Sequence, residues 1–426
     1  MSATEAAVAR GRSRSPLRTA NFRFLWLGES LSGFAFQGTQ FLLPLLALTA
    51  AGSSAFGVGL VSAAQFLPTV VLSLLAGGIV GRFAVRGLLV VCNVLRGGTL
   101  GLLGALCAVD EPTVALLAAV ALAVGAVTVF HDVGYQAAVP RVLGPDQLTT
   151  GNGLSEASYS VAQMAGPALA GAAVQHAGLP ATAAFAAAAF LGALVCFGPL
   201  RIGPADGPET QRPLRTVVSG LKFTWRSHTL RDLCVQSALF NLHEQAFLTA
   251  FMVFAVRSLH LSSGTVGLVL GLGSLGALLG SLWVGRMAAR LHVGAAVSWS
   301  LTVCAVALLG GTALTSVFPG PVALAAAFFV NGVALAVYNV FVLSLRGALA
   351  PAEHMAMVMA GYRLVSMAPV PLGALIGGLL VEAVGAFSAL VAIAASLTLA
   401  SLALRRSPVR EIRRLTDPAD APSGPS

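Results

Sequence analysis

The sequence predicts an all-α membrane protein whose twelve transmembrane helices form two six-helix, pseudo-symmetric halves. Three observations predict this fold class. The chain is 57% hydrophobic and only 10% charged, which is more apolar surface than a water-soluble fold can cover. Its basic residues gather in alternate gaps between apolar stretches. Short motifs of the first half recur in the second half at a nearly constant offset.

Each predicted span is an apolar stretch that can cross the hydrocarbon core, which takes about 20 residues in a helix. Most gaps between the stretches hold only a few residues, so consecutive spans are expected to be hairpin neighbours. The expected spans are 24–50, 57–80, 87–108, 113–139, 155–175, 181–200, 233–256, 264–285, 293–315, 320–345, 360–381 and 386–404.

The basic residues predict the orientation of the chain. They are concentrated in the two tails and in the even-numbered gaps, whereas the odd-numbered gaps hold little basic charge apart from Arg257. By the positive-inside rule, both termini are then cytoplasmic. The net charge of +9 is therefore a signal of topology. Because the cations are spread over several loops and form no compact patch, a nucleic-acid partner is not expected.

A polar segment divides the spans into six and six. The expected organisation is a tail over 1–22, a first half over 23–200, a linker over 201–231, a second half over 232–404 and a tail over 405–426. Within 213–233, apolar residues at helical spacing alternate with basic ones. This pattern predicts either an amphipathic helix at the cytoplasmic membrane interface or a solvated linker helix.

Two motifs relate the halves to each other. The pattern V-G-R-x-A-x-R occupies 80–86 after the second span and 284–290 after the eighth, an offset of about 204 residues. The segments 142–145 and 348–351 follow spans 4 and 10 at almost the same offset. Two related six-helix halves predict a binding site at their interface, near the middle of the membrane.

Four segments carry a resemblance to a known family: 143–153 before span 5, 166–171 in span 5, 220–226 before span 7 and 371–378 in span 11. They resemble the major facilitator superfamily, and within it the bacterial drug:proton antiporters that include macrolide and enterobactin exporters. The resemblance covers almost the whole chain. It implies a secondary transporter of the bacterial cell (inner) membrane, which is not an enzyme and needs no cofactor.

The function that this resemblance implies is proton-coupled efflux of a hydrophobic or amphiphilic small molecule by alternating access. An antibiotic, a secondary metabolite or a siderophore would be the cargo. Proton-coupled uptake and lipid flipping on the same fold are the alternatives. A membrane-embedded sensor or enzyme would require a reactive constellation or a large soluble domain, and neither is visible. The expected partners are the small molecule, protons and the lipid bilayer, and the chain is expected to be a monomer.

The superfamily's loop motif G-x-x-x-D-R-x-G-R-R, between spans 2 and 3, is only partly present. Arg82 and Arg86 match it, but Gly81 stands where the aspartate belongs. The repeat carries Arg286 and Arg290 and lacks the aspartate as well. The resemblance implies that the aspartate stabilises the outward-open state, so the inner gate of this protein must be held differently or more loosely.

A path for protons requires ionisable side chains at membrane depth, where an ionised group costs about 2.5–3.5 kcal/mol at a helix centre. The densest cluster lies in span 7, with Asn241, His243 and Glu244. Glu244 is the first candidate for a protonatable carboxyl group, because desolvation favours its neutral form. His243 is a candidate relay. The alternative is a glutamate paired to a hydroxyl group or an arginine.

A second cluster lies in span 4, where Asp132 follows His131 and Tyr135 is one turn away. This cluster has three interpretations. It takes part in proton coupling, it takes part in gating, or Asp132 is only capped by a basic residue of a loop. Arg96 in span 3 needs a counter-charge, which Asp132 or Glu29 could supply, and a structural ion pair is expected. Further candidates for coupling or for the cavity are Glu29, Glu156 and Asn339.

The remaining candidates are gating and helix-packing residues. Gly166 and Pro167 lie in a segment similar to the antiporter signature G-P-x-x-G-G, and Pro371 and Gly373 lie in span 11. Proline removes one helical hydrogen bond and bends the helix, while glycine lets a neighbouring helix approach closely. The resemblance implies that the signature seals the cavity against proton leak. The G-x-G-x-x-G pattern at 271–276 lies inside an apolar span, so it predicts a packing face and no nucleotide site.

Overall fold

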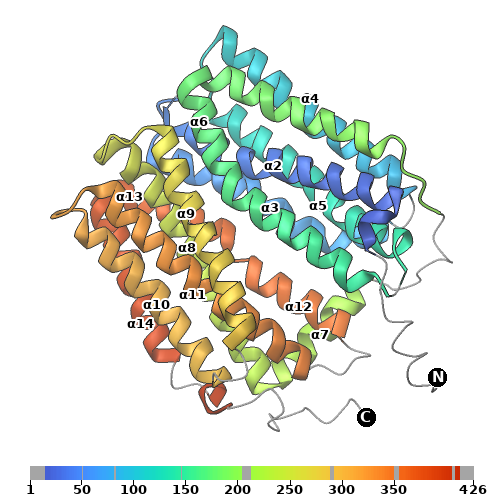
Figure 1. The fold of residues 1–426 in the computed structure, drawn as a ribbon. Coiled ribbons are helices and arrows are strands. Elements are labelled where there is room, and N and C mark those ends of the chain that lie inside the picture. The colour runs from blue at the N-terminus through green and yellow to red at the C-terminus, as the bar shows by residue number, and fades with distance from the viewer. Residues whose placement is uncertain are drawn as a thin grey trace.

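The computed structural model describes residues 15–49, 51–80, 83–144, 146–203, 213–287, 292–349, 355–404 and 408–412, and throughout these ranges the regular structure is helical (Figure 1). The first half consists of α2 (Ala20–Thr49), α3 (Ala55–Val80), α4 (Val85–Val109), α5 (Val114–Val142) and α6 (Leu148–Phe197), preceded by a short turn η1 (Pro16–Arg18). The second half consists of α8 (His228–Val253) with its continuation η2 (Phe254–Ser258), α9 (Ser263–Met287), α10 (Val293–Leu314), α11 (Gly320–Leu349), α12 (Met355–Met367), α13 (Val370–Val384) and α14 (Ala386–Leu404). The linker helix α7 (Pro213–Arg226) precedes α8, and a short turn η5 (Pro408–Glu411) follows α14.

Eleven segments of the described chain are long and apolar enough to span a membrane. One of them, α6, has 50 residues, more than twice the length of one crossing. It turns back at Gly178, whose φ of 82° is the one non-helical backbone conformation within α6. The described chain therefore crosses the membrane twelve times, and the turn lies in the gap predicted between spans 5 and 6.

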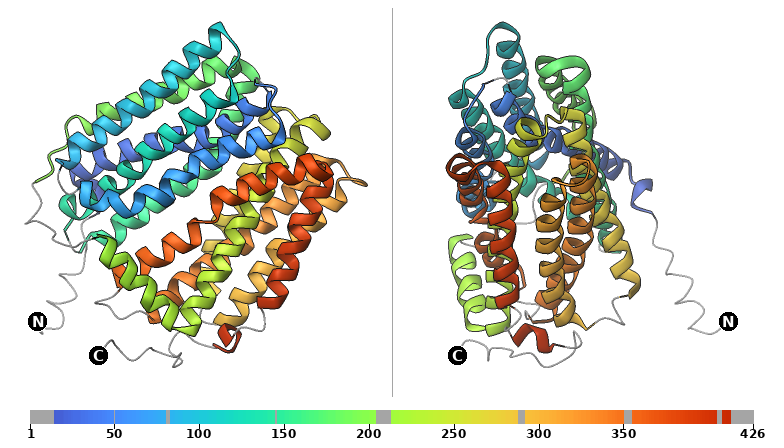
Figure 2. Two further views of the ribbon diagram at one scale, coloured as in Figure 1. Left: turned by 180° about the vertical axis from the view of Figure 1, so that it is seen from behind. Right: turned by 90° about the vertical axis from the view of Figure 1, so that its left-hand side faces the viewer.

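The two halves lie side by side, with α2–α6 on one side and α8–α14 on the other (Figure 2). They meet along two pairs of helices, where α6 packs against α9 and α3 packs against α13. The start of α2 and the turn η5 lie at the same end of the bundle (Figure 1). We call this the inner end, and we call the opposite end, where α3 and α9 begin, the outer end.

The internal repeat extends to the contacts between the halves. A Cβ atom on Gly59 of α3 would come within 2.6 Å of the Ala374 carbonyl oxygen of α13, and one on Gly267 of α9 would collide with the Pro167 carbonyl oxygen of α6. Likewise Gly378 of α13 lies against Ala55, and Gly171 of α6 lies against Ser263. We call these four glycine contacts the outer seal. The two related helix pairs thus use the same residue type at equivalent positions.

The connections at the outer end are short. Residues 110–113 join α4 to α5, residues 259–262 join η2 to α9, and residues 315–319 join α10 to α11. Two further hairpins turn at a single glycine each, Gly178 and Gly385, both with φ of 82°. A side chain would be strained in this left-handed region, so glycine is required at both turns.

Several predicted boundaries were wrong. The helix of span 5 begins at Leu148 rather than at residue 155, and Pro167 lies inside it with helical backbone angles. The amphipathic helix ends at Arg226 because Ser227 caps α8, its Oγ accepting the Leu230 N–H at 3.3 Å. Span 11 is two helices, since Pro369 lacks the N–H that a continuous helix needs.

Candidate functional site

A cavity of about 260 Å³ lies between the two halves. Helices α2, α3 and α6 of the first half line it together with α8, α9 and α11 of the second. Four phenyl rings give it apolar walls, and six carboxamides with three hydroxyl groups add hydrogen-bonding groups. These side chains are Phe41, Phe66, Phe251 and Phe328; Gln37, Gln40, Gln65, Gln163, Gln245 and Asn331; and Ser62, Thr249 and Ser274.

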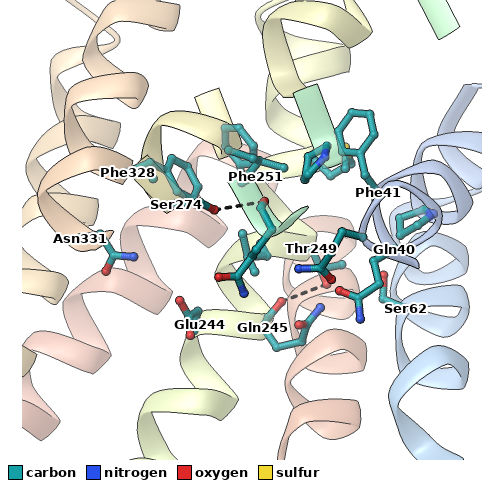
Figure 3. A pocket seen from close by; sticks show the side chains of 18 of the residues that line it. Gln40, Phe41, Ser62, Glu244, Gln245, Thr249, Phe251, Ser274, Phe328 and Asn331 are labelled. Atoms are coloured by element: carbon teal, nitrogen blue, oxygen red, sulfur yellow. Dashed lines mark hydrogen bonds between the residues drawn. The ribbon is translucent and has the colours of Figure 1, made fainter. Parts of the chain in front are cut away.

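Glu244 is the one ionisable residue among the described residues that line this cavity (Figure 3). It lies near the middle of the membrane-crossing run 228–258. The side-chain amide of Asn331, from α11, lies against its carboxyl group. The carboxyl group therefore faces the interface between the halves, at the depth where the repeat predicts a binding site.

Other polar groups of the lining differ in how they are satisfied. The Ser274 hydroxyl donates to the Gln163 carbonyl oxygen at 3.3 Å, which links α9 to α6, and the Thr249 hydroxyl donates to the Gln245 carbonyl oxygen at 3.0 Å. In contrast, Nε2 of Gln65 and Oδ1 of Asn331 are buried with no hydrogen-bond partner among the described residues. Buried polar atoms normally have partners, so these two are candidates to hydrogen-bond a ligand in the cavity.

Close backbone contacts between the halves lie on the outer side of the cavity, and exposed polar residues lie on its inner side. The outer seal lies beyond it on both sides, on α3 with α13 and on α6 with α9. Toward the inner end, the α6 face that holds Gln163 continues one and two turns away with Tyr159, which is 48% exposed, and with exposed Glu156. The α11 face that holds Asn331 continues in the same way to exposed Asn339.

Two of the span 7 candidates lie outside the cavity lining. Asn241 donates through Nδ2 to the Ser366 carbonyl oxygen at 2.8 Å, close to the break between α12 and α13. The His243 ring nitrogen Nδ1 lies 2.7 Å from the Leu239 carbonyl oxygen of its own helix. Both side chains thus bind backbone, and of the three residues Glu244 alone lines the cavity.

The second predicted cluster does come together, away from the cavity lining. His131 of α5 lies 3.6 Å from Glu29 of α2 and 3.8 Å from Asp132, and it is 1% exposed. Tyr135 hydrogen-bonds through its hydroxyl group to Ser155 of α6 at 2.6 Å. The first half therefore contains its own buried polar group, formed by residues from α2, α5 and α6.

The expected ion pair of Arg96 is absent from the described residues. Its guanidinium group instead hydrogen-bonds to Ser32 at 2.9 Å and to Asn93 at 3.2 Å, and it stacks on the Phe190 ring at 4.6 Å from the centroid. Neutral acceptors and a π face thus satisfy this cation directly. Carboxylates act on it at longer range, because Glu29 and Asp132 both interact with it electrostatically.

The gating and packing candidates fall into two groups. Arg86 and Arg286 are exposed at the inner end, whereas Arg82 and Arg290 lie outside the described residues. The glycines lie at close helix contacts within one half, because a Cβ on Gly166 would meet Gln37 at 2.7 Å and one on Gly373 would collide with the Leu242 carbonyl oxygen. Pro371 lies in the first turn of α13, where no helical N–H is required.

Most of the carboxamide lining was not predicted from the sequence. The only available signal is that glutamines are uncommon in apolar spans, where they are expected to face protein or a water-filled cavity. Gln37 and Gln40 in α2 and Gln65 in α3 fit this rule. The spacing alone could not show that helices from both halves bring them to one cavity.

The chain matches known transporters in sequence and in fold. The family model of the transmembrane secretion effectors (MFS_3) matches residues 12–423. An uncharacterised MFS-type transporter, y4rN of Sinorhizobium fredii (strain NBRC 101917 / NGR234), is 30% identical over 156 residues, which are 36% of this chain and 38% of that protein.

Solved structures with a similar fold include the nucleoside transporter NupG (D323A mutant), at a TM-score of 0.72 and 14% identity over 90% of this chain and 99% of that one. A bacterial homologue of the iron transporter ferroportin has a TM-score of 0.67 and 16% identity over 92% of this chain and 100% of that one. At this level of identity the likeness shows the fold alone. The family match over nearly the full length shows that the chain belongs to the transmembrane secretion effector family and is a membrane transporter of the MFS type.

Proposed function

We propose that this transporter exports a hydrophobic or amphiphilic small molecule in exchange for protons, by alternating access of the cavity between its halves. The cargo would be an antibiotic, a secondary metabolite or a siderophore. The observation that carries the proposal is the position of Glu244, which is the one ionisable residue in the described cavity lining. The orientation inferred from the basic residues makes the inner end cytoplasmic, in the membrane of a bacterial cell.

The exchange follows from the chemistry of one carboxyl group in an apolar cavity. Burial favours its neutral form, so it is stable when it holds a proton or when a cationic group lies beside it. One carboxylate cannot be neutralised by both at once. Loading of a cationic cargo at the inner end therefore favours release of the proton there, and protonation at the outer end favours release of that cargo.

The lining also supports a class of cargo. Phenyl rings such as Phe251 and Phe328 bind apolar surface and the faces of cations, while the carboxamides both donate and accept hydrogen bonds. No lysine or arginine belongs to the described lining. This composition favours neutral or positively charged amphiphiles over anions, so anionic siderophores are the least favoured of the three classes of cargo.

Everted membrane vesicles with an acidic lumen test the proposal. We expect them to accumulate at least one compound from a panel of ethidium, erythromycin and a catecholate siderophore. If one proton is exchanged per molecule, a pH difference of one unit sustains about a tenfold accumulation. Glu244→Gln should reduce accumulation to the level of vesicles without the protein while binding is retained. Glu111→Gln, which removes an exposed carboxyl group from the connection between α4 and α5, is the matched control.

Other outcomes identify the alternatives. Outflow of a preloaded compound together with protons would indicate uptake symport, and movement of a labelled lipid between leaflets would indicate flipping. Proton-driven accumulation that is unchanged in Glu244→Gln would exclude Glu244 as the coupling residue. If no compound moves in any direction, the proposed export of these classes of cargo is wrong.

A further inference from the structure

Each ring nitrogen of His131 faces a carboxyl group. Nε2 lies 3.6 Å from Oε2 of Glu29, and Nδ1 lies 3.8 Å from Oδ1 of Asp132. Neither nitrogen has a hydrogen-bond partner in the described chain, and neither has Oε2 of Glu29. The imidazole is 1% exposed, whereas the Asp132 side chain is 44% exposed. The three groups form a chain from the exposed Asp132 carboxylate, through the buried imidazole, to Glu29, whose side chain is 27% exposed and whose Oε2 is buried.

The surroundings determine the charge of this group. The titratable or charged groups that interact with it come from α2, α4, α5 and α6, namely Glu29, Cys92, Arg96, Asp132, Tyr135 and Tyr159. From α6 the Phe197 ring also lies edge-on to the imidazole, 6.1 Å between centroids. With the cysteine and tyrosines neutral, and with both carboxyl groups ionised, the group carries one net negative charge when His131 is neutral. A single proton shared between Glu29 and His131 therefore makes the group neutral.

One added proton would give the unpartnered polar atoms hydrogen-bond partners, and it would also remove the net negative charge. An imidazolium can donate to Glu29 and to Asp132 at once, which would give partners to the ring nitrogens and to Oε2 of Glu29. It would also bring the net charge of the buried group to zero, and low dielectric surroundings favour neutrality. We propose that Glu29, His131 and Asp132 form a second proton-binding site, filled from the inner end through Asp132. Its use in coupling rests on the proposed function, but proton binding itself does not.

Nuclear magnetic resonance of the purified transporter, labelled with ¹³C-histidine, tests this site without any cargo. We expect a resonance that is missing in His131→Gln to titrate between about pH 5 and pH 9 in the unaltered protein. In Glu29→Gln, and in Asp132→Asn as a second variant, the same histidine should stay neutral over this range. In Glu244→Gln it should titrate as before, which separates this site from the cavity.

A His131 that does not titrate in the unaltered protein, or that titrates unchanged in both carboxyl variants, would overturn the second site. Far-ultraviolet circular dichroism and gel filtration would identify a carboxyl variant that has failed to fold. The titration of His131 in the other carboxyl variant then tests the site. The outcome does not depend on transport, so a failed search for a cargo would leave this result intact.

An independent observation concerns the outer end, where charged residues of the second half bind the backbone of the first. Oε1 of Glu382 in α13 accepts the Phe56 N–H at 2.9 Å, and its carboxylate also hydrogen-bonds to Ser54. Nη2 of Arg257 donates to the Ser53 carbonyl oxygen at 2.5 Å. These contacts surround the start of α3, whose first N–H groups lack helical partners and attract negative charge.

The equivalent place in the repeat has no such charge. The turn at Gly178 corresponds to the turn at Gly385, so Gln175 corresponds to Glu382. Oε1 of Gln175 lies at the start of α9, where it would collide with a Cβ on Gly264. One side of the outer end thus has a carboxylate at a helix start and the other has a neutral carboxamide. We infer that Glu382 and Arg257 form a latch, which stabilises the conformation closed at the outer end.

The latch can be tested by double electron–electron resonance, with spin labels at Glu111→Cys and Val317→Cys in a background without the native cysteines. Both positions are exposed at the outer end, one in each half. We expect Glu382→Ala to raise the ratio of outward-open to inward-open molecules roughly two- to fivefold, the range of a charge at a helix end. Gln175→Ala, its counterpart in the repeat, should leave the ratio unchanged.

Arg257→Gln should shift the distances in the same direction as Glu382→Ala. A salt concentration of about 1 M should move the unaltered protein toward the variants, since it screens exposed charges. The latch is excluded if Glu382→Ala and Arg257→Gln have the same distance distributions as the unaltered protein. It is also excluded if Gln175→Ala shifts the distances as much as Glu382→Ala does.

Discussion

At the scale of single residues, the rarest side chains were the most informative. Glu244 was predicted from the sequence because a carboxyl group in an apolar span has few structural uses. His243, its neighbour, looked equally promising, yet it binds the Leu239 carbonyl oxygen of its own helix. Adjacent residues lie about 100° apart on a helix, and the sequence does not state which of the two faces the cavity.

Asn241 illustrates the same limit, and it supports a prediction about stability. Its side chain binds the Ser366 carbonyl oxygen near the break between α12 and α13. Without water nearby, a carbonyl group that loses its partner costs about 1–3 kcal/mol. We expect Asn241→Leu to lower the free energy of unfolding by this amount, measured by thermal unfolding in detergent. Asn339→Leu, at an exposed position, should change stability by less than about 0.5 kcal/mol.

Equal stability of the two variants would mean that the bond to Ser366 contributes nothing. A changed pH dependence of transport in Asn241→Leu would indicate that the amide takes part in proton coupling. The geometry of the hydrogen bond argues for the structural role.

At the scale of helices, the sequence predicted which stretches cross the membrane better than where they end. Hydropathy identifies apolar length, but α6 continues seven residues toward the inner end beyond the apolar stretch that was predicted to start at residue 155. The break in span 11 was foreseeable, since Pro369 and Pro371 lie close together.

The outer seal supports a prediction about proton leak. A Cβ on Gly378 would come within 2.6 Å of the Ala55 carbonyl oxygen, so any larger residue must push α13 away from α3. We expect Gly378→Val to speed the collapse of a pH gradient in proteoliposomes several-fold. A pH-sensitive dye inside the liposomes would measure it.

Gly310→Val is the matched control, because a Cβ at Gly310 would meet nothing within 4 Å. It should leave the leak at the level of the unaltered protein. If Gly378→Val is equally tight, close approach of the two backbones is not what keeps the outer end impermeable.

At the scale of the whole molecule, the repeat in the sequence was the most reliable guide. Two short motifs predicted the related halves, and the structure extends the relation to the glycine contacts between them, such as Gly59 with Ala374 and Gly267 with Pro167. The motif containing Gly166 and Pro167 and the one containing Gly373 and Ala374 are therefore counterparts. This was hidden in the sequence, because the two motifs share little beyond small residues.

The distribution of charge also makes sense only for the molecule as a whole. Arg257 is the exception to the predicted asymmetry of basic residues, and it binds Ser53 at the outer end. The carboxamide lining could not be predicted, because its members come from six helices of both halves. Their convergence depends on the relative tilt of the helices, which no local pattern encodes.

The short connections at the outer end limit how this protein can be recognised from that side. The described linkers there hold five residues or fewer, and two hairpins turn at a single glycine. An antibody contacts roughly 800 Å² on its target, which such turns do not provide as one continuous epitope. Detection reagents and crystallisation chaperones should therefore be raised against the opposite face, where α7, the start of α2 and the turn η5 lie.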